Sequence, residues 1–160
     1  MAGKLHKLTL PTLLGSHTRA FSDGAQDGGK IEEMALQLAE VTGESTGDIT
    51  VKLDELSKII PDLGAVHLGF PSVQPKTLLR LALNLDEVFQ RIFRLKTMLP
   101  ACDILFMVCK RPTLVIDDDL QLVHTTLQDL KNKGYSSDMI EAIAEDFPGL
   151  LVKVPPSSSL

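Results

Sequence analysis

The 160-residue sequence has no tryptophan, one tyrosine and six phenylalanines, so aromatic residues make up only 4% of the chain. A fold that depends on aromatic stacking, such as an RNA-binding sheet with an aromatic face, is therefore not expected. The sequence also lacks the roughly 18 consecutive apolar residues of a membrane-spanning helix, and we predict no membrane span. Leucine, isoleucine and valine supply the core instead, which favours helix packing in one soluble domain with tails.

Cysteine is scarce, with Cys102 and Cys109 as the two examples. A spacing of seven residues separates them by roughly 10 Å along one helix, which is too far for a disulfide. No pair of histidines stands near them at the spacing of zinc ligands. We therefore expect both thiols to be buried as small hydrophobic side chains, and we expect neither a metal nor a cofactor.

Acidic residues outnumber basic ones, and the net charge is −5. The distribution is uneven: residues 22–75 hold three Lys against ten acids, residues 76–115 seven Lys and Arg against three acids, and residues 116–160 three Lys against eight acids. The overall balance disfavours attraction to phosphate backbones, whereas the basic middle favours it. Random scatter of surface charge is the alternative interpretation, and both stay open here.

The first 22 residues have the composition of an organelle transit peptide. Residues 1–22 contain Lys4, Lys7 and Arg19, several Ser and Thr, scattered Leu and no acid. The RAFS sequence at residues 19–22 is similar to a mitochondrial cleavage signal. A basic tail without a targeting role is the alternative. We expect an organellar protein, and composition does not choose between mitochondrion and chloroplast.

Residues 30–152 show apolar positions every three or four residues, which indicates helices. The pattern predicts helices over residues 30–41, 48–60, 75–83, 86–97, 101–111, 120–132 and 137–145. Glycine or proline ends several of them, at Gly43, Pro61, Pro112 and Gly134. The DGAQDGG sequence at residues 23–29 is expected as a flexible linker, and residues 153–160 as a disordered tail.

The predicted helices repeat along the chain with an offset of 35 residues. The offset pairs Val88 with Val123, Ile92 with Leu127, Leu95 with Leu130, Lys96 with Lys131, Asp103 with Asp138, Leu105 with Ile140, and Val108 with Ile143. Each unit reads helix, turn, helix, proline and a brief apolar turn, and a looser copy spans residues 31–61. A helix pair leaves one apolar face bare, which a stacked neighbour covers. Chance similarity of amphipathic helices is the alternative. We predict an all-α fold, an α-solenoid of about three two-helix repeats of either hand.

Two stretches carry a family resemblance: LKNKGYSSDMIEAIAEDFPGLL at residues 130–151 and CKRPTLV at residues 109–115. They resemble the repeat of the mitochondrial transcription termination factor (mTERF) family, in which two antiparallel helices precede a short third helix that opens with proline. Gly134 and Pro148 match that pattern. The preceding unit departs from it, because Pro100 occupies the turn and the glycine is missing. Family members usually contain more repeats than the three found here.

The resemblance implies a role in organelle gene expression, through nucleic-acid binding along a basic inner surface or through a nucleoprotein such as the ribosome. The candidate nucleic-acid-binding residues, for DNA or RNA, are Arg80, Arg91, Arg94, Lys96, Lys110, Arg111, Lys131 and Lys133. Lys and Arg on one face would neutralise phosphates. The alternative is a solvated helix surface, and with it a helical-repeat adaptor that binds a protein partner and no nucleic acid.

No catalytic residue is predicted, and we do not expect an enzyme. Asp117–Asp119 are interpreted as helix-capping residues, and His67 and His124 as surface histidines without a nucleophile at motif spacing. The GAQDGGK sequence at residues 24–30 matches part of a phosphate-binding loop. However, Ile31 takes the place of the magnesium-binding Ser or Thr, so we interpret this sequence as linker.

Overall fold

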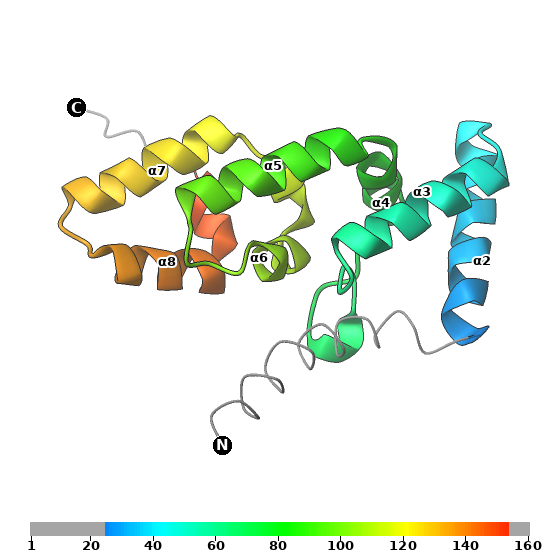
Figure 1. The fold of residues 1–160 in the computed structure, drawn as a ribbon, viewed down its shortest axis with the longest axis horizontal. Helices are drawn as coiled ribbons and strands as arrows, with labels where there is room; N and C mark the ends of the chain where they lie inside the picture. Colours follow the sequence, from blue (N-terminus) through cyan, green and yellow to red (C-terminus); the bar gives the residue numbers. More distant parts are fainter. Residues whose placement is uncertain (1–24, 154–160) are drawn as a thin grey trace, which may run out of the picture. The chain divides into compact units, whose positions relative to one another are not determined.

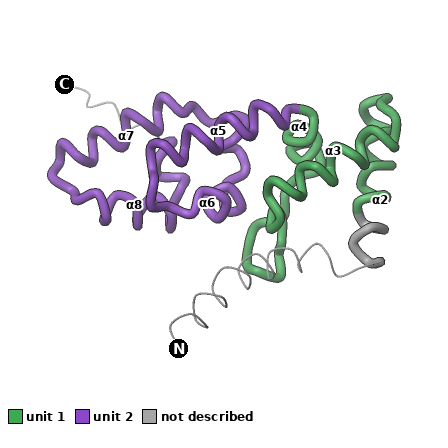
Figure 2. The backbone as a smooth tube through the Cα atoms, in the orientation of Figure 1, with its two compact units in different colours: residues 1–83 green, residues 84–160 purple. Residues whose placement is uncertain are grey.

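The computed structural model describes residues 25–153, and in this range seven α-helices and three 3₁₀ helices follow one another without a strand (Figure 1). The predicted all-α class is confirmed. Within the described range, none of the helices is long and apolar enough to cross a membrane. The transit peptide predicted over residues 1–22 and all but the first residue of the tail predicted over residues 153–160 lie outside the described residues. The chain forms two compact units, which divide between Leu83 and Asn84 (Figure 2).

Unit 1 contains α2 (Ala25–Thr42), α3 (Thr46–Ile59), the 3₁₀ helix η1 (Val66–Leu68) and α4 (Pro75–Leu83). Helix α2 packs along α3, and α4 contacts both. The contact buries Ala35, Leu38, Ile49, Leu53, Leu56, Ile60, Leu79 and Leu81. Helix α2 begins five residues before the expected start, so most of the predicted linker is helical. Ala25 and Gln26 are good helix formers, which supports the earlier start.

Unit 2 contains α5 (Leu85–Met98), α6 (Ile104–Lys110), η2 (Pro112–Val115), α7 (Leu120–Asn132), α8 (Ser137–Asp146) and η3 (Pro148–Val152). Helices α5 and α6 contact each other and η2, and α7 and α8 contact each other and η3 in the same way. In addition, α5 contacts α7, and α6 contacts α8. The first helices of the two pairs therefore lie beside each other, as do the second helices (Figure 1).

Burial in unit 2 corrects the predicted 35-residue alignment. In the first helices the offset matches Val88 with Val123, which are both fully buried, whereas Leu95 is fully buried and its predicted counterpart Leu130 is half-buried. In the second helices the buried positions correspond at 36 residues, as in Ile104 with Ile140. Leu105, which the sequence paired with Ile140, is only half-buried. The reason is that the second pair has one more residue than the first between these buried positions of its two helices.

Side-chain caps set the start of three helices in unit 2. Asp103 accepts a hydrogen bond from the Phe106 amide at 3.0 Å, Asp119 from Gln121 at 2.8 Å, and Ser136 from Met139 at 3.3 Å. Because Asp103 is the cap, α6 begins at Ile104 and not at residue 101. Cys102 therefore precedes the helix that contains Cys109, so the two do not share a helix. Both are buried and free, as predicted.

Candidate functional site

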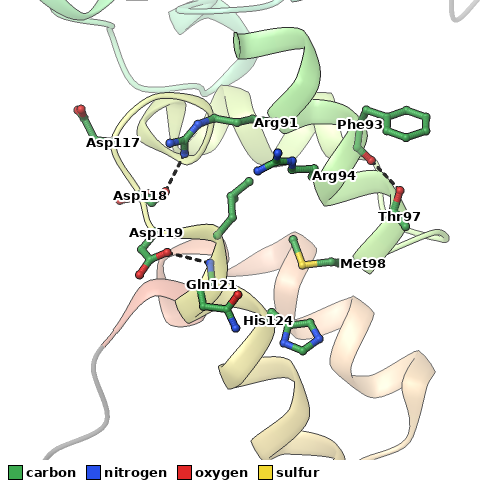
Figure 3. Close-up of a pocket in the computed structure, with 11 residues that line it drawn as sticks. Arg91, Phe93, Arg94, Thr97, Met98, Asp117, Asp118, Asp119, Gln121 and His124 are labelled. Atoms are coloured by element: carbon green, nitrogen blue, oxygen red, sulfur yellow. Dashed lines mark hydrogen bonds between the residues drawn. The ribbon is translucent and has the colours of Figure 1, made fainter.

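Unit 2 has an open groove of about 710 Å³ between α5 and the start of α7 (Figure 3). The C-terminal half of α5 forms one wall, and the segment that enters α7 forms the other. The lining residues are Arg91, Phe93, Arg94, Thr97, Met98, Asp117, Asp118, Asp119, Leu120, Gln121 and His124. The groove thus has a cationic wall on α5 opposite an acidic one.

In the acidic wall, Asp118 and Asp119 accept hydrogen bonds from other residues of unit 2. Asp118 accepts two hydrogen bonds from Arg111, from Nε at 2.6 Å and from Nη2 at 3.0 Å, and a third from the Thr113 hydroxyl at 2.8 Å. The hydrogen bonds that Arg111 donates to Asp118 raise the pKa of Arg111 despite partial burial, so this guanidinium stays charged. Asp119 caps α7. The sequence explained the three aspartates by helix capping and dipole complementarity; Asp119 is the cap, whereas Asp118 is the ion-pair partner of Arg111.

The two arginines of the α5 wall differ in their contacts within the described residues. Arg91 donates from Nε to Glu87 at 2.9 Å and from Nη1 to the Asp118 carbonyl at 2.8 Å. Arg94 lines the same groove, is exposed and has no ion pair or hydrogen bond within the described residues. The two arginines that the sequence placed on one helix face therefore do reach one groove, but Arg91 is already hydrogen-bonded.

Two phenylalanines on α5 point to solvent. Phe93 is 68% exposed and Phe89 is 62% exposed, and a spacing of four places them on one face. The Phe93 ring extends outward from α5, away from Asp118 (Figure 3). The sequence analysis singled out neither residue. The signal it missed is that Val88 and Leu95 already define the buried face, and neither phenylalanine is in register with them.

The other predicted nucleic-acid-binding residues do not gather at the groove. Lys96 donates to the Cys102 carbonyl at 2.9 Å. Lys110 donates to the Glu145 and Asp146 carbonyls at 3.1 and 3.2 Å. Arg80 belongs to α4 of unit 1 and has an interaction of its own. Lys131 and Lys133 are exposed near the end of α7, without a hydrogen bond or ion pair to the described residues.

The described residues hold no group of three or more His, Cys, Asp or Glu arranged to bind a metal ion. His67 is exposed in η1, and His124 is exposed at the groove. Burial, supported by the nearby charges of Glu141 and Glu145, raises the pKa of the Cys102 thiol to about 11, against an opposing effect of Lys96. A thiol with such a pKa is a poor nucleophile at neutral pH.

Comparison with protein-family models, curated proteins and solved structures gave no match. The mTERF resemblance therefore stays a prediction from the sequence. Charge adds a further constraint on function, since residues 84–153 hold eight Lys and Arg against eleven Asp and Glu. A protein surface with this balance does not attract phosphate backbones over its whole area.

Proposed function

We propose that this chain is a helical-repeat adaptor that binds a protein partner through α5. The observation that carries the proposal is the pair of exposed rings, Phe89 and Phe93, beside the groove that Arg94 lines. Aromatic and arginine side chains are enriched among the residues that dominate binding energy at protein interfaces. Two exposed rings on one helix face form an apolar patch, and exposed apolar patches mark interaction sites.

The chemistry of the surface suggests the kind of partner. An amphipathic helix could lay an apolar face across Phe89 and Phe93, in the manner of helix-in-groove recognition. A carboxylate on that helix could pair with the Arg94 guanidinium, which has no acidic partner among the described residues. The partner we propose is therefore a protein segment with aliphatic and acidic residues.

The repeated order of two helices and a proline-initiated 3₁₀ helix supports a repeat array related to the mTERF family. Helices α5, α6 and η2 have this order, as do α7, α8 and η3, and η2 and η3 open with Pro112 and Pro148. We propose α2, α3 and η1 as a third, looser copy. A function in organelle gene expression rests on this resemblance and on the predicted transit peptide.

Site-specific photo-crosslinking in the native cells tests the adaptor proposal. A photoreactive amino acid at position 93 should yield a discrete adduct with one protein, which nuclease treatment leaves intact. Position 147 is the matched control, because Phe147 is 62% exposed but lies at the end of α8. Absence of an adduct at position 93, or equal adducts at both positions, would contradict the proposal.

Nucleic-acid binding is the second candidate function, and one observation favours it. Arg94, Lys131 and Lys133 are exposed cations without partners among the described residues, so they are available to phosphates. The test is a titration of duplex DNA and RNA at several salt concentrations. If this candidate holds, binding weakens as salt rises, and Arg94→Glu reduces both the affinity and the salt dependence. Salt-independent or undetectable binding would reject it.

A further inference from the structure

Helix α5 carries four exposed side chains in one stripe: Asp86, Phe89, Phe93 and Lys96. Their spacing of three, four and three residues keeps all four within about 80° around the helix axis, at about 100° per residue. The buried face of α5, which includes Val88, lies roughly 120° away from the middle of the stripe. The stripe therefore faces away from the core of unit 2 and presents an acid, two rings and a base in that order.

The order of these side chains is self-complementary. Asp86 and Lys96 lie five residues before and after position 91. Phe89 and Phe93 lie two residues before and after it. Two copies of α5 that run antiparallel and cross at position 91 therefore place Asp86 of each copy opposite Lys96 of the other, and Phe89 of each copy opposite Phe93 of the other. A two-fold interface requires this property, because the same patch on both copies must match itself.

A hollow of about 430 Å³ between α5 and the start of α6 borders the stripe. Ile92 and Leu105 are half-buried in its lining, and Lys96 lines it too. The Lys96 ammonium donates to the Cys102 carbonyl at 2.9 Å, and an ammonium has three N–H donors. Because Lys96 is exposed, it can also donate to a carboxylate from outside without losing that hydrogen bond. The hollow adds apolar surface for an incoming ring beside the stripe itself.

We propose that α5 of a second copy of this chain binds the stripe in antiparallel orientation. The inference rests on the proposed use of α5 as a protein interface, and it names the partner. A helix with an apolar face and a carboxylate is the partner proposed above, and α5 of a second copy is such a helix. Like charges stay apart in this arrangement, because the two copies of Asp86 lie roughly 15 Å from each other along the helices. That separation exceeds the screening length of about 8 Å at physiological salt.

The interface would be small, so the dimer should depend on concentration. Four rings of about 150–250 Å² each, roughly two-thirds exposed, would bury about 400–650 Å². Specific stable interfaces bury about 1,200–2,000 Å² in total, which places this contact at the weak end even with the charged pairs and the hollow included. We therefore expect a dissociation constant on the order of 10–100 µM.

Sedimentation equilibrium of the purified full chain, from about 1 µM to about 500 µM, tests the proposal. The mass of the wild type should rise with concentration from the 17.5 kDa monomer toward twice that value. Asp86→Lys and Lys96→Asp each place like charges opposite each other at both ends of the stripe, and each should raise the dissociation constant about tenfold or more. An equimolar mixture of the two variants should restore the dimer, because each chain then meets the opposite charge twice.

Asp129→Lys and Lys133→Asp are the matched controls, since they reverse the same charges at exposed positions beside or in the last turn of α7. Both should leave the dissociation constant unchanged, and circular dichroism of every variant verifies its fold. A wild-type chain that stays monomeric throughout, charge variants that dimerise as the wild type does, or a mixture no tighter than its components would overturn the proposal.

Failure of this dimer and failure of the adaptor function give different results. A purified chain that stays monomeric, together with an adduct at position 93 to a different protein in cells, removes the second copy as partner and keeps α5 as an interface. Absence of any adduct at position 93 in cells removes the adaptor function itself.

Discussion

Arg111 and Asp118 form a bidentate ion pair across η2, with Nε to Oδ2 at 2.6 Å and Nη2 to Oδ1 at 3.0 Å. The pair ties the end of α6 to the segment that enters α7. Two parallel hydrogen bonds between charged groups are stronger and more directional than a single neutral one. Arg111 was predicted to bind nucleic acid. In the structure its guanidinium instead forms an ion pair within the fold.

Removing the carboxylate of Asp118 should destabilise unit 2. Asp118→Ala leaves the Arg111 guanidinium and the Thr113 hydroxyl without their acceptor. We expect a loss of about 1–2 kcal/mol in the free energy of unfolding, discounted because Arg111 is partly exposed. Chemical denaturation measures it. Asp129→Ala, at an exposed position of α7, should change stability by less than about 0.5 kcal/mol. Equal effects of the two substitutions would contradict the structural role of the pair.

Lys110 should matter for stability, unlike Lys133. Its ammonium donates to two carbonyls at the end of α8 and lies 4.2 Å from the centre of the Phe106 ring. Lys110→Met should therefore lower stability by about 1–2 kcal/mol through the lost cap and cation–π contact. Lys133→Met should have almost no effect. Thermal unfolding of the two variants compares them directly, and a Lys133 variant that is equally destabilised would refute the assignment.

Gly134 ends α7 in the left-handed conformation, with φ +90°. The Gly134 amide donates to the Lys131 carbonyl and the Tyr135 amide to the Leu130 carbonyl, which is the Schellman arrangement. A Cβ at Gly134 would meet no atom within 4 Å, so the backbone alone sets the penalty. Gly134→Ala should destabilise by about 1–2 kcal/mol. Gly47→Ala, inside α3, should instead stabilise slightly, and calorimetry should show opposite changes in the melting temperature.

The Cys102 thiol should make stability fall at alkaline pH. Folding raises its pKa from 9.0 to about 11, so the folded chain keeps the proton to higher pH than the unfolded chain. This contribution is fully present below pH 9 and is lost as pH rises toward 11. Denaturation at about pH 8 and about pH 10.5 should therefore show a larger loss for the wild type than for Cys102→Ala. Parallel losses in both proteins would contradict the raised pKa.

Local chemistry in the sequence predicted much of the fold. Pro75, Gly134 and the Ser136 cap define helix ends that the structure reproduces, because each acts on its own backbone neighbours. The start of α6 was predicted at residue 101, directly after Pro100. In the structure Asp103 is the cap, so the helix begins at Ile104. The apolar turn after Pro112 was also identified, and it is the buried 3₁₀ helix η2.

The candidate site was harder to predict, because its determinants are contacts between distant residues. Lys110 was predicted as a surface cation, yet residues 35 and 36 positions away supply its carbonyl acceptors. The exposure of Phe89 and Phe93 was not predicted, because only the packing of α5 shows which of its apolar residues face solvent. A helical pattern reveals that a helix has an apolar face, but the width of that face depends on its neighbours.

The most direct test of the proposed adaptor function is the native size of the chain in its own cells. In size-exclusion chromatography of a gentle extract, we predict elution well above the 17.5 kDa monomer, with no change after nuclease treatment. Phe89→Ser combined with Phe93→Ser should return the chain to the monomer position, whereas Phe147→Ser should leave the complex intact. A nuclease-sensitive complex, or a complex that survives loss of both α5 phenylalanines, would contradict the proposed interface.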